Sequence, residues 1–364
     1  MTLPARAARA KGAPSLASPA VTVVIPAFNA AGTIGRALAS LRAQTYPDLE
    51  VIVVDDGSRD HTAERVRAEY PGARCIRQDN AGPSAARNRG VQEASGELVA
   101  FLDSDDEFAP EKVARQVEVL IGGDDVQVCG TNGLVVEGRR AYPFNATARP
   151  ALIRWSFHDI IWDCHPVMAS LMLPRALFLE MGGYDPQMRI GEDKDLLMRL
   201  AGAGCGVVEI NRPLYIMHRL PGSLSTGRAE DRASRVAAIA RWDPERNPDS
   251  PLTRREYVRA LGHRAIVSAA ECSREGGHDA ARELLAWLDD VPDLPPAHRA
   301  LHRLSKLSYP AFGVAGNGYR RWRALADATR RWGGISGLAR QCWRRYIASD
   351  VAGQTDAAGE LATR

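Results

Sequence analysis

Apolar runs that alternate with amphipathic helical segments over residues 21–128 constrain the fold of this chain more than any other feature. The runs are rich in β-branched residues, and the segments between them place apolar residues three and four positions apart. Such alternation predicts a mostly parallel sheet with helices on both faces. We expect strands at 21–25, 50–54, 73–77 and 98–102, and helices near 34–41, 60–70, 84–94 and 113–120.

The rest of the chain is less regular. Residues 128–225 mix an apolar segment at 167–173, a helical pattern at 193–201 and a strand-like run at 206–210. Almost everything from 228 to 346 reads as helix. We predict a disordered N-terminal tail over 1–20, a Rossmann-like α/β domain over 21–227, a helical region over 228–350 and a flexible tail over 351–364.

The composition excludes several classes of protein. Hydrophobic residues make up 45% of the 364 residues, which is enough for a full core, and the net charge of +3 gives no general reason to expect a nucleic acid partner. The six cysteines form no CxxC pair, which favours reduced thiols in a cytosolic protein over disulfides or a zinc site. No apolar run reaches the length of about 18 residues that predicts a membrane-spanning helix.

Two acidic clusters directly follow predicted strands. Asp55 and Asp56 open the sequence Asp-Asp-Gly-Ser, where the carboxylates could bind a ribose or a base, or form a capped turn. Asp103, Asp105 and Asp106 lie within four residues, and their mutual repulsion favours a bound Mg²⁺ or Mn²⁺. The alternative is a helix N-terminus, where acidic residues favour the helix dipole.

Three further segments carry candidate site residues. Arg87 or Arg89 could bind a phosphate, while at least one of them lies on a solvated helix face. Glu192 and Asp193 open a predicted helix, where one carboxylate could act as a general base or both could serve as caps. His218 could complete a metal site or contact a diphosphate, although a lone histidine is more often structural.

Together these segments resemble glycosyltransferase family 2, which has the GT-A fold. The resemblance covers residues 21–225. Each motif alone is weak evidence, but six of them occur in the family's order. They are Val-Thr-Val-Val-Ile-Pro-Ala-Phe-Asn, Asp-Asp-Gly-Ser, Asn-Ala-Gly with Ala-Arg-Asn-Arg-Gly, Asp-Ser-Asp-Asp, Gly-Gly-Tyr-Asp and Gly-Glu-Asp.

The resemblance implies a nucleotide site at the ends of the first strands. Pro26 and Phe28 would line the nucleotide pocket. Asp56 would bind the edge of a uracil-type base, with support from Asp55. Arg87 would face the base or the phosphates.

The resemblance also implies a divalent cation, Mn²⁺ or Mg²⁺. Asp106 would be its ligand, and Asp105 would contact the ribose or sugar and share the metal. Asp103 would take part in either task, and His218 would contact the metal or a phosphate.

The activity that the resemblance implies is inverting, metal-dependent sugar transfer from a nucleotide diphosphate sugar to a hydroxyl of a glycan or lipid-linked acceptor. Asp193 would be the catalytic base, and Glu192 would touch the acceptor or the donor sugar. Such an enzyme would serve the biosynthesis of cell-surface polysaccharide or glycoconjugate. The alternative is a non-catalytic module of the same fold that binds nucleotide sugars or carbohydrate and has no need for Asp193.

The C-terminal third is basic and lies outside the resemblance. Residues 299–346 contain eleven Lys or Arg and one acidic residue, Asp327. Their pattern fits either a helix on an anionic membrane surface or an ordinary helix packed on the catalytic domain. We expect a cytoplasmic protein, peripheral on the inner face of the cell membrane if these helices bind lipid. The apolar stripe of this segment contains Ile335, Leu338, Ala339, Cys342 and Tyr346.

Overall fold

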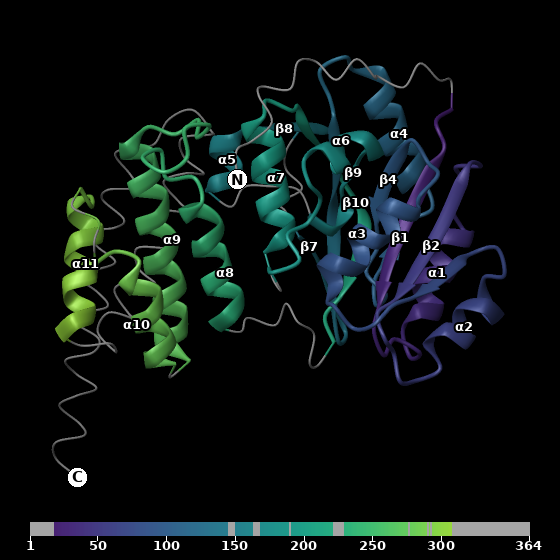
Figure 1. The fold of residues 1–364 in the computed structure, drawn as a ribbon, viewed down its shortest axis with the longest axis horizontal. Helices are drawn as coiled ribbons and strands as arrows, with labels where there is room; N and C mark the ends of the chain where they lie inside the picture. Colours follow the sequence, from purple (N-terminus) through teal and green to yellow (C-terminus); the bar gives the residue numbers. More distant parts are fainter. Residues whose placement is uncertain are drawn as a thin grey trace, which may run out of the picture. The chain divides into compact units, whose positions relative to one another are not determined.

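The structure is a computed structural model that describes residues 18–144, 150–162, 168–188, 191–220, 229–275, 277–289, 291 and 293–307 (Figure 1). The chain divides into two compact units. The first runs up to Ser234 and takes in Arg241–Pro251, and the second contains Arg235–Ala240 and the chain from Leu252 onward. The segment Arg241–Pro251 therefore belongs to the first unit, and the predicted boundary at residue 227 stays a prediction.

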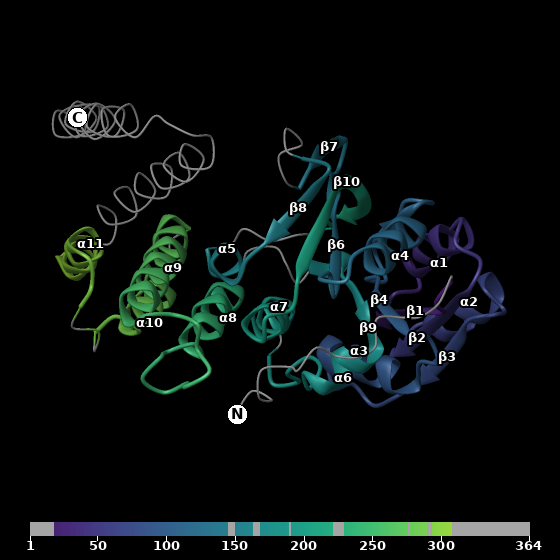
Figure 2. The same ribbon diagram turned by 90° about the horizontal axis from the view of Figure 1, so that it is seen from above.

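The first unit is built on a ten-stranded mixed sheet. Its first half is parallel, as predicted, with the order β3-β2-β1-β4. Helices cover both faces of this half, and Figure 2 shows α1 and α4 on one side of β1 and α3 on the other. The strands are β1 (Val21–Ala27), β2 (Leu49–Asp55), β3 (Arg74–Arg77) and β4 (Leu98–Phe101), and the helices are α1 (Ile34–Arg42), α2 (Thr62–Glu69), α3 (Pro83–Glu93) and α4 (Lys112–Gly122).

The second half of the sheet is mixed. β9 (Met172–Pro174) lies antiparallel between β4 and β6 (Val128–Glu137), and β6 pairs in parallel with β10 (Val207–His218). The antiparallel strands β5 (Glu107–Phe108) and β8 (Leu152–Trp155) pair with β10, and β7 (Arg140–Pro143) pairs with β6.

The strand predicted at 206–210 was too short. β10 continues to His218 through a register shift around Pro213. Proline cannot donate a ladder hydrogen bond, so the sequence at this point reads as a turn. The extension matters because it carries the end of β10 to the loop that follows β4.

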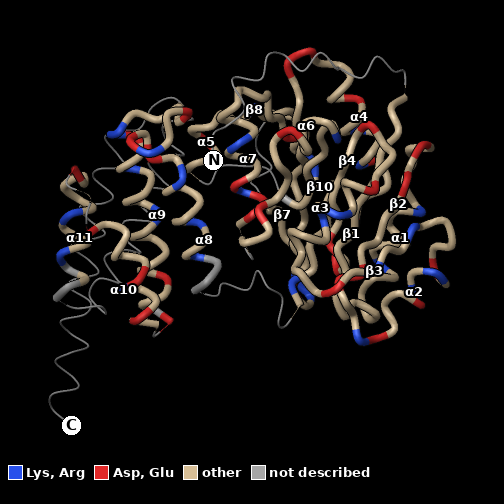
Figure 3. Tube along the Cα trace, in the orientation of Figure 1, with Lys and Arg blue, Asp and Glu red and all other residues tan. Residues whose placement is uncertain are grey.

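Three short or medium helices complete the first unit: α5 (Phe157–Ile161), α6 (Arg175–Glu180) and α7 (Glu192–Gly202). The helix predicted at 193–201 is confirmed by α7, which begins one residue earlier. Acidic residues, red in Figure 3, gather in α7.

The second unit is helical, as predicted. It contains α9 (Arg254–Arg274), α10 (His278–Ala286) and α11 (Pro296–Leu307), and α8 (Ala229–Ala240) spans the division between the units. In the described part of the chain, no helix has the length and apolarity needed to cross a membrane. The basic segment beyond residue 307, with its apolar stripe from Ile335 to Tyr346, lies outside the described residues, and its contact with a membrane stays a prediction.

Candidate active site

The turn after β2 is built around Asp55. This carboxylate is fully buried. Its Oδ1 accepts the backbone N–H of Ser58 at 2.9 Å, and its Oδ2 pairs with Nη1 of Arg77 at 3.0 Å. Gly57 has a φ of 79°, a conformation that glycine adopts without a steric cost. Asp55 therefore holds the turn that presents its neighbour Asp56.

The Asp56 carboxylate organises the loop that leads into α3. Its Oδ1 accepts hydrogen bonds from Nε2 of Gln78 at 2.8 Å and from the backbone N–H of Ala81 at 2.9 Å. Its Oδ2 accepts from the N–H of Gly82 at 2.8 Å, and the side chain is buried. Asp56 lies at the end of β2, at the expected edge of the sheet. A nucleobase that bonds to Asp56 would share its carboxylate oxygens with the N–H groups of this loop.

The end of β1 supplies the other residues expected at the nucleotide. Pro26 lies within the buried strand, whereas Phe28 directly follows it and is 50% exposed. Asn29 has a φ of 49°, and its backbone N–H donates to Oγ of Ser58 at 2.9 Å. The ends of β1 and β2 are therefore tied together, with the ring of Phe28 available to stack on a planar base.

The acidic loop, Asp103–Asp106, joins β4 to β5. Asp106 is buried, and its carboxylate accepts the hydroxyl of Tyr215 and the backbone N–H of His218, each at 2.8 Å. Burial and the carboxylates of Asp103 and Asp105 raise the pKa of Asp106 to about 8. Burial and Asp103 raise the pKa of Asp105 as well. Burial and mutual repulsion therefore disfavour the ionised forms of Asp105 and Asp106, and a bound divalent cation would favour them.

The donor set of this loop fits a hard divalent cation in an open site. Within the described residues, no three His, Cys, Asp or Glu side chains gather into a metal-binding group. Mg²⁺, however, is usually held by one or two carboxylates together with substrate phosphates. Asp105 and Asp106 supply two adjacent carboxylates whose pKa values are raised by burial and by neighbouring carboxylates, although Arg36 lowers that of Asp105.

His218, the last residue of β10, lies beside the acidic loop. Its Nε2 lies 2.6 Å from Oε1 of Glu107, and Glu107 also pairs with Arg36 at 3.6 Å. The ring is thereby oriented by a carboxylate that the sequence did not single out. The predicted metal or phosphate contact of His218 stays a prediction and would involve the other ring nitrogen.

Arg87 of α3 links the acidic loop to α7. Its Nη2 donates to Oδ1 of Asp103 at 2.6 Å, and its Nη1 donates to Oε1 of Glu192 at 2.8 Å. Its guanidinium lies 5.6 Å from the centre of the Tyr184 ring, and the side chain is 11% exposed. Arg89, by contrast, is half exposed and pairs with Glu93 on its own helix. Of the two arginines, Arg87 is the one inside the site.

The first turn of α7 carries the carboxylates expected to act in catalysis. Burial and the neighbouring Asp193 raise the pKa of Glu192 to about 7, although Arg87 lowers it. Asp193 is less buried, and its Oδ1 accepts the backbone N–H of Lys194 at 2.7 Å. Gly191, the residue before the helix, has a φ of 83° and turns the chain into the site. Of the pair, Asp193 is therefore the more accessible carboxylate.

Tyr215 is a site residue to which the sequence analysis gave no role. It is fully buried; its hydroxyl donates to Asp106, and its oxygen lies 3.4 Å from the backbone nitrogen of Asp103. Its ring packs against Phe108 at 5.8 Å. A tyrosine between the apolar residues Leu214 and Ile216 was the available signal, because a buried hydroxyl requires a polar partner.

Comparisons with known proteins identify the family of this chain. The family model described as Glycosyl transferase family 2 matches residues 22–172. An uncharacterized glycosyltransferase of Nostoc sp. is 40% identical over 232 residues, which cover 60% of this chain and 72% of that protein. The chain belongs to glycosyltransferase family 2. It is therefore a glycosyltransferase by class, and the resemblance of its motifs is confirmed.

One further relative and one solved structure are similar to this family 2 glycosyltransferase. The succinoglycan biosynthesis protein ExoO of Rhizobium meliloti is 36% identical over 219 residues, which cover 57% of this chain and 63% of ExoO, somewhat under two thirds of that protein. The crystal structure of S. aureus TarS 1-349 in complex with UDP-GlcNAc has a TM-score of 0.63 at 18% identity, covering 83% of this chain and 92% of that one. The likeness to TarS shows that the fold is GT-A.

Proposed function

We propose that this family 2 glycosyltransferase transfers a sugar from a nucleotide diphosphate sugar, with uridine as the base, to a hydroxyl of a glycan or lipid-linked acceptor. The observation that carries the proposal is the double contact of Arg87 with Asp103 and Glu192. It brings the acidic loop, on the donor side, and the first turn of α7 into one site. The UDP-GlcNAc bound by TarS and the polysaccharide named for ExoO support the donor and acceptor classes.

The donor side would bind the nucleotide at the ends of β1, β2 and β4. Phe28 offers an exposed ring for the base, and Asp56 holds the loop beside it. A divalent cation held by Asp105 and Asp106 would neutralise charge on the diphosphate leaving group. Asp103, oriented by Arg87, would contact the ribose or the sugar.

The first turn of α7 would supply the catalytic base. Asp193 removes the proton from the acceptor hydroxyl while that oxygen attacks the anomeric carbon from the face opposite the diphosphate. The new bond forms as the bond to the diphosphate oxygen breaks, so the configuration inverts, as in inverting glycosidases with water replaced by the acceptor. Glu192, held by Arg87, would orient the acceptor or donor sugar beside Asp193.

The donor site can be tested by thermal unfolding with UDP, GDP, CDP and TDP and their sugars, each with and without Mn²⁺. A ligand at about 100 times its dissociation constant adds roughly 2.7 kcal/mol to the free energy of unfolding. We expect UDP and one UDP-sugar to stabilise the protein when Mn²⁺ is present. Stabilisation by GDP, CDP or TDP in place of UDP would show that the nucleobase of the donor is not uracil. Stabilisation by none of the nucleotides would contradict the proposal.

The matched variants for this test are Asp105→Asn and Asp124→Asn. Asp105→Asn removes a proposed cation ligand, whereas substitution of Asp106 would also disturb its contacts with Tyr215 and His218. Asp124 is an exposed residue after α4. We expect Mn²⁺-dependent stabilisation to be lost in Asp105→Asn and kept in Asp124→Asn; equal stabilisation of both would remove Asp105 from the cation site.

A further inference from the structure

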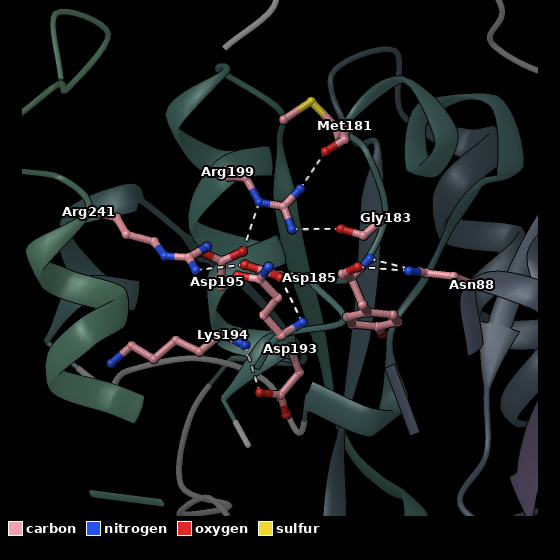
Figure 4. Close-up of polar contacts among 11 residues, drawn as sticks. Asn88, Met181, Gly183, Asp185, Asp193, Lys194, Asp195, Arg199 and Arg241 are labelled. Atoms are coloured by element: carbon pink, nitrogen blue, oxygen red, sulfur yellow. Dashed lines mark hydrogen bonds and ion pairs between the residues drawn. The ribbon is translucent and has the colours of Figure 1, made fainter. Parts of the chain in front are cut away.

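A third acidic residue in the first turn of α7, Asp195, is held from two directions. It is only 2% exposed. Its Oδ2 accepts Nε of Arg199 at 2.9 Å, and its Oδ1 accepts Nη1 of Arg241 at 3.2 Å. Figure 4 shows the two guanidinium groups on either side of this carboxylate, with Asp193 on the same turn of the helix. The turn that carries the proposed base is therefore anchored through Asp195.

Arg199 ties α7 to the turn that follows α6. Its Nη2 donates to the carbonyl oxygen of Gly183 at 2.6 Å, and its Nη1 donates to that of Met181. Gly183 has a φ of 66°, and a Cβ there would lie 2.6 Å from Oδ1 of Asn88. The backbone of this turn is thus packed closely on α3, so Arg199 connects α7 to a closely packed neighbour.

Arg241 adds a second connection, which reaches around the Glu192–Asp193 pair. Its Nη2 donates to Oδ2 of Asp185 at 2.6 Å, while its Nη1 donates to Asp195. Asp185 precedes the pair in sequence and Asp195 follows it, so one guanidinium joins the chain on both sides of the two carboxylates (Figure 4).

The segment that carries Arg241 is itself held on the first unit. The ring of Trp242, which is 2% exposed, lies 4.7 Å from that of Phe157 in α5. A Cβ on Gly202, at the end of α7, would lie 2.5 Å from the Trp242 ring, which shows how closely the two pack. Nδ2 of Asn247 donates to the carbonyl oxygen of Arg241 at 3.1 Å. The guanidinium therefore extends from an anchored backbone.

From these contacts we infer that Arg241 is a positioning residue for the transfer reaction: it fixes the first turn of α7, and with it Asp193, relative to the donor side. This inference rests on the proposed function of Asp193. Arg241 lies beyond the residues matched by the family model, which end at 172, and beyond the predicted domain boundary at 227. The segment Arg241–Pro251 is thus a functional part of the catalytic unit.

The test compares Arg241→Gln with Arg115→Gln. Arg115 is a matched control because it is 48% exposed against 44% for Arg241 and also contacts two carboxylates, Glu111 and Glu118. The first readout is amide hydrogen exchange of peptides within α7, which needs no substrate. We expect faster exchange in α7 for Arg241→Gln, partial restoration in Arg241→Lys, and no change for Arg115→Gln. Unchanged exchange in Arg241→Gln would overturn the inference.

The second readout is the rate of UDP release by hydrolysis of UDP-glucose and UDP-N-acetylglucosamine, with water as the acceptor of the sugar, measured well below the unfolding temperature. A small displacement of a reacting group can cost about 10²-fold in rate, so we expect a kcat lower by roughly 10-fold to 10²-fold in Arg241→Gln with the KM for the donor little changed. An equal loss of kcat in Arg115→Gln would contradict a positioning role for Arg241. A larger KM with unchanged kcat in Arg241→Gln would also contradict it.

Asp193→Asn separates this inference from the proposed function. If Asp193→Asn is inactive while Arg241→Gln keeps the wild-type kcat, only the inference about Arg241 is wrong. If Asp193→Asn releases UDP at the wild-type rate, Asp193 is not the base, and both the proposed mechanism and the inference built on it are wrong.

Discussion

The donor side and the α7 side of this site are held in different ways. On the donor side, Asp56 is bonded mainly to backbone N–H groups of the next loop, Ala81 and Gly82. On the α7 side, Glu192 and Asp195 are bonded to the side chains of Arg87 and Arg241, which lie 105 and 46 residues away in sequence. At Asp56 the donor side is thus held mainly by backbone groups of the following loop, and the first turn of α7 is held by long side chains from distant parts of the chain. We expect changes on the donor side to alter ligand affinity, and changes near α7 to alter rate.

Substitution of Arg87 should have the largest effect on stability, because this residue joins the two sides. Arg87→Gln leaves the carboxylates of Asp103 and Glu192 without their cationic partner, and loss of one partner of a buried ion pair costs roughly 3–5 kcal/mol. Arg89→Gln, on the same helix, removes an exposed pair and should cost at most about 1 kcal/mol. Urea unfolding measures both. Equal losses would show that Arg87 does not bridge the two sides.

The pH dependence of the free energy of unfolding should reveal the raised pKa of Glu192 on the α7 side of the site. Its pKa is raised from 4.5 to about 7, so between these values the folded state binds more protons than the unfolded state, and stability falls as pH rises. Each pKa unit corresponds to about 1.4 kcal/mol, so the wild type should lose on the order of 2–3 kcal/mol more than Glu192→Gln between pH 5 and pH 8.

Urea unfolding at several pH values measures this difference. Glu118→Gln, in which an exposed carboxylate is removed from α4, is the control and should follow the wild-type curve. Parallel curves for wild type and Glu192→Gln would show that Glu192 keeps an ordinary affinity for protons in the folded protein.

Loss of the Tyr215 hydroxyl should have the smallest effect. Tyr215→Phe removes one donor to the buried Asp106 carboxylate, and an unsatisfied buried acceptor costs about 1–3 kcal/mol. Because Mn²⁺ would offset part of this loss, the difference from wild type should narrow when Mn²⁺ is present. Tyr142→Phe, which removes an exposed hydroxyl bonded to Glu137 and Arg219, is the control. A difference that does not depend on Mn²⁺ would argue against a cation at Asp106.

The parts of the fold that sequence predicted well are those set by local pattern. β1 to β4 and α1 to α4 follow from short-range alternation, and the acidic clusters at strand ends follow from parallel pairing. The insertion of β9 antiparallel between β4 and β6 could not be predicted, because pairing between strands distant in sequence leaves no local signal. β10 was cut short in the prediction because the register shift at Pro213 resembles a turn.

In the candidate site too, local sequence indicated some features, whereas contacts between distant parts of the chain could not be predicted. The types of residue at Asp103–Asp106 and Glu192–Asp193, together with the family resemblance, led to the hypotheses of cation binding and base catalysis, which stay predictions. The partners of these residues did not follow from it, because the contacts of Arg87 with Glu192, of Tyr215 with Asp106 and of Arg241 with Asp195 depend on how separate elements pack. An arginine in a helix reads as a surface residue until its buried carboxylate partner is known.

The measurement that tests the central claim most directly is the turnover of the best UDP-sugar by Asp193→Asn, together with the affinity of this variant for UDP and Mn²⁺. Asparagine keeps the shape of the side chain but cannot accept the proton. The account predicts a rate lower by about 10²–10⁴-fold with wild-type affinity for UDP, because the base is lost and the donor side is intact. Wild-type turnover by Asp193→Asn, or loss of UDP binding in step with loss of turnover, would contradict it.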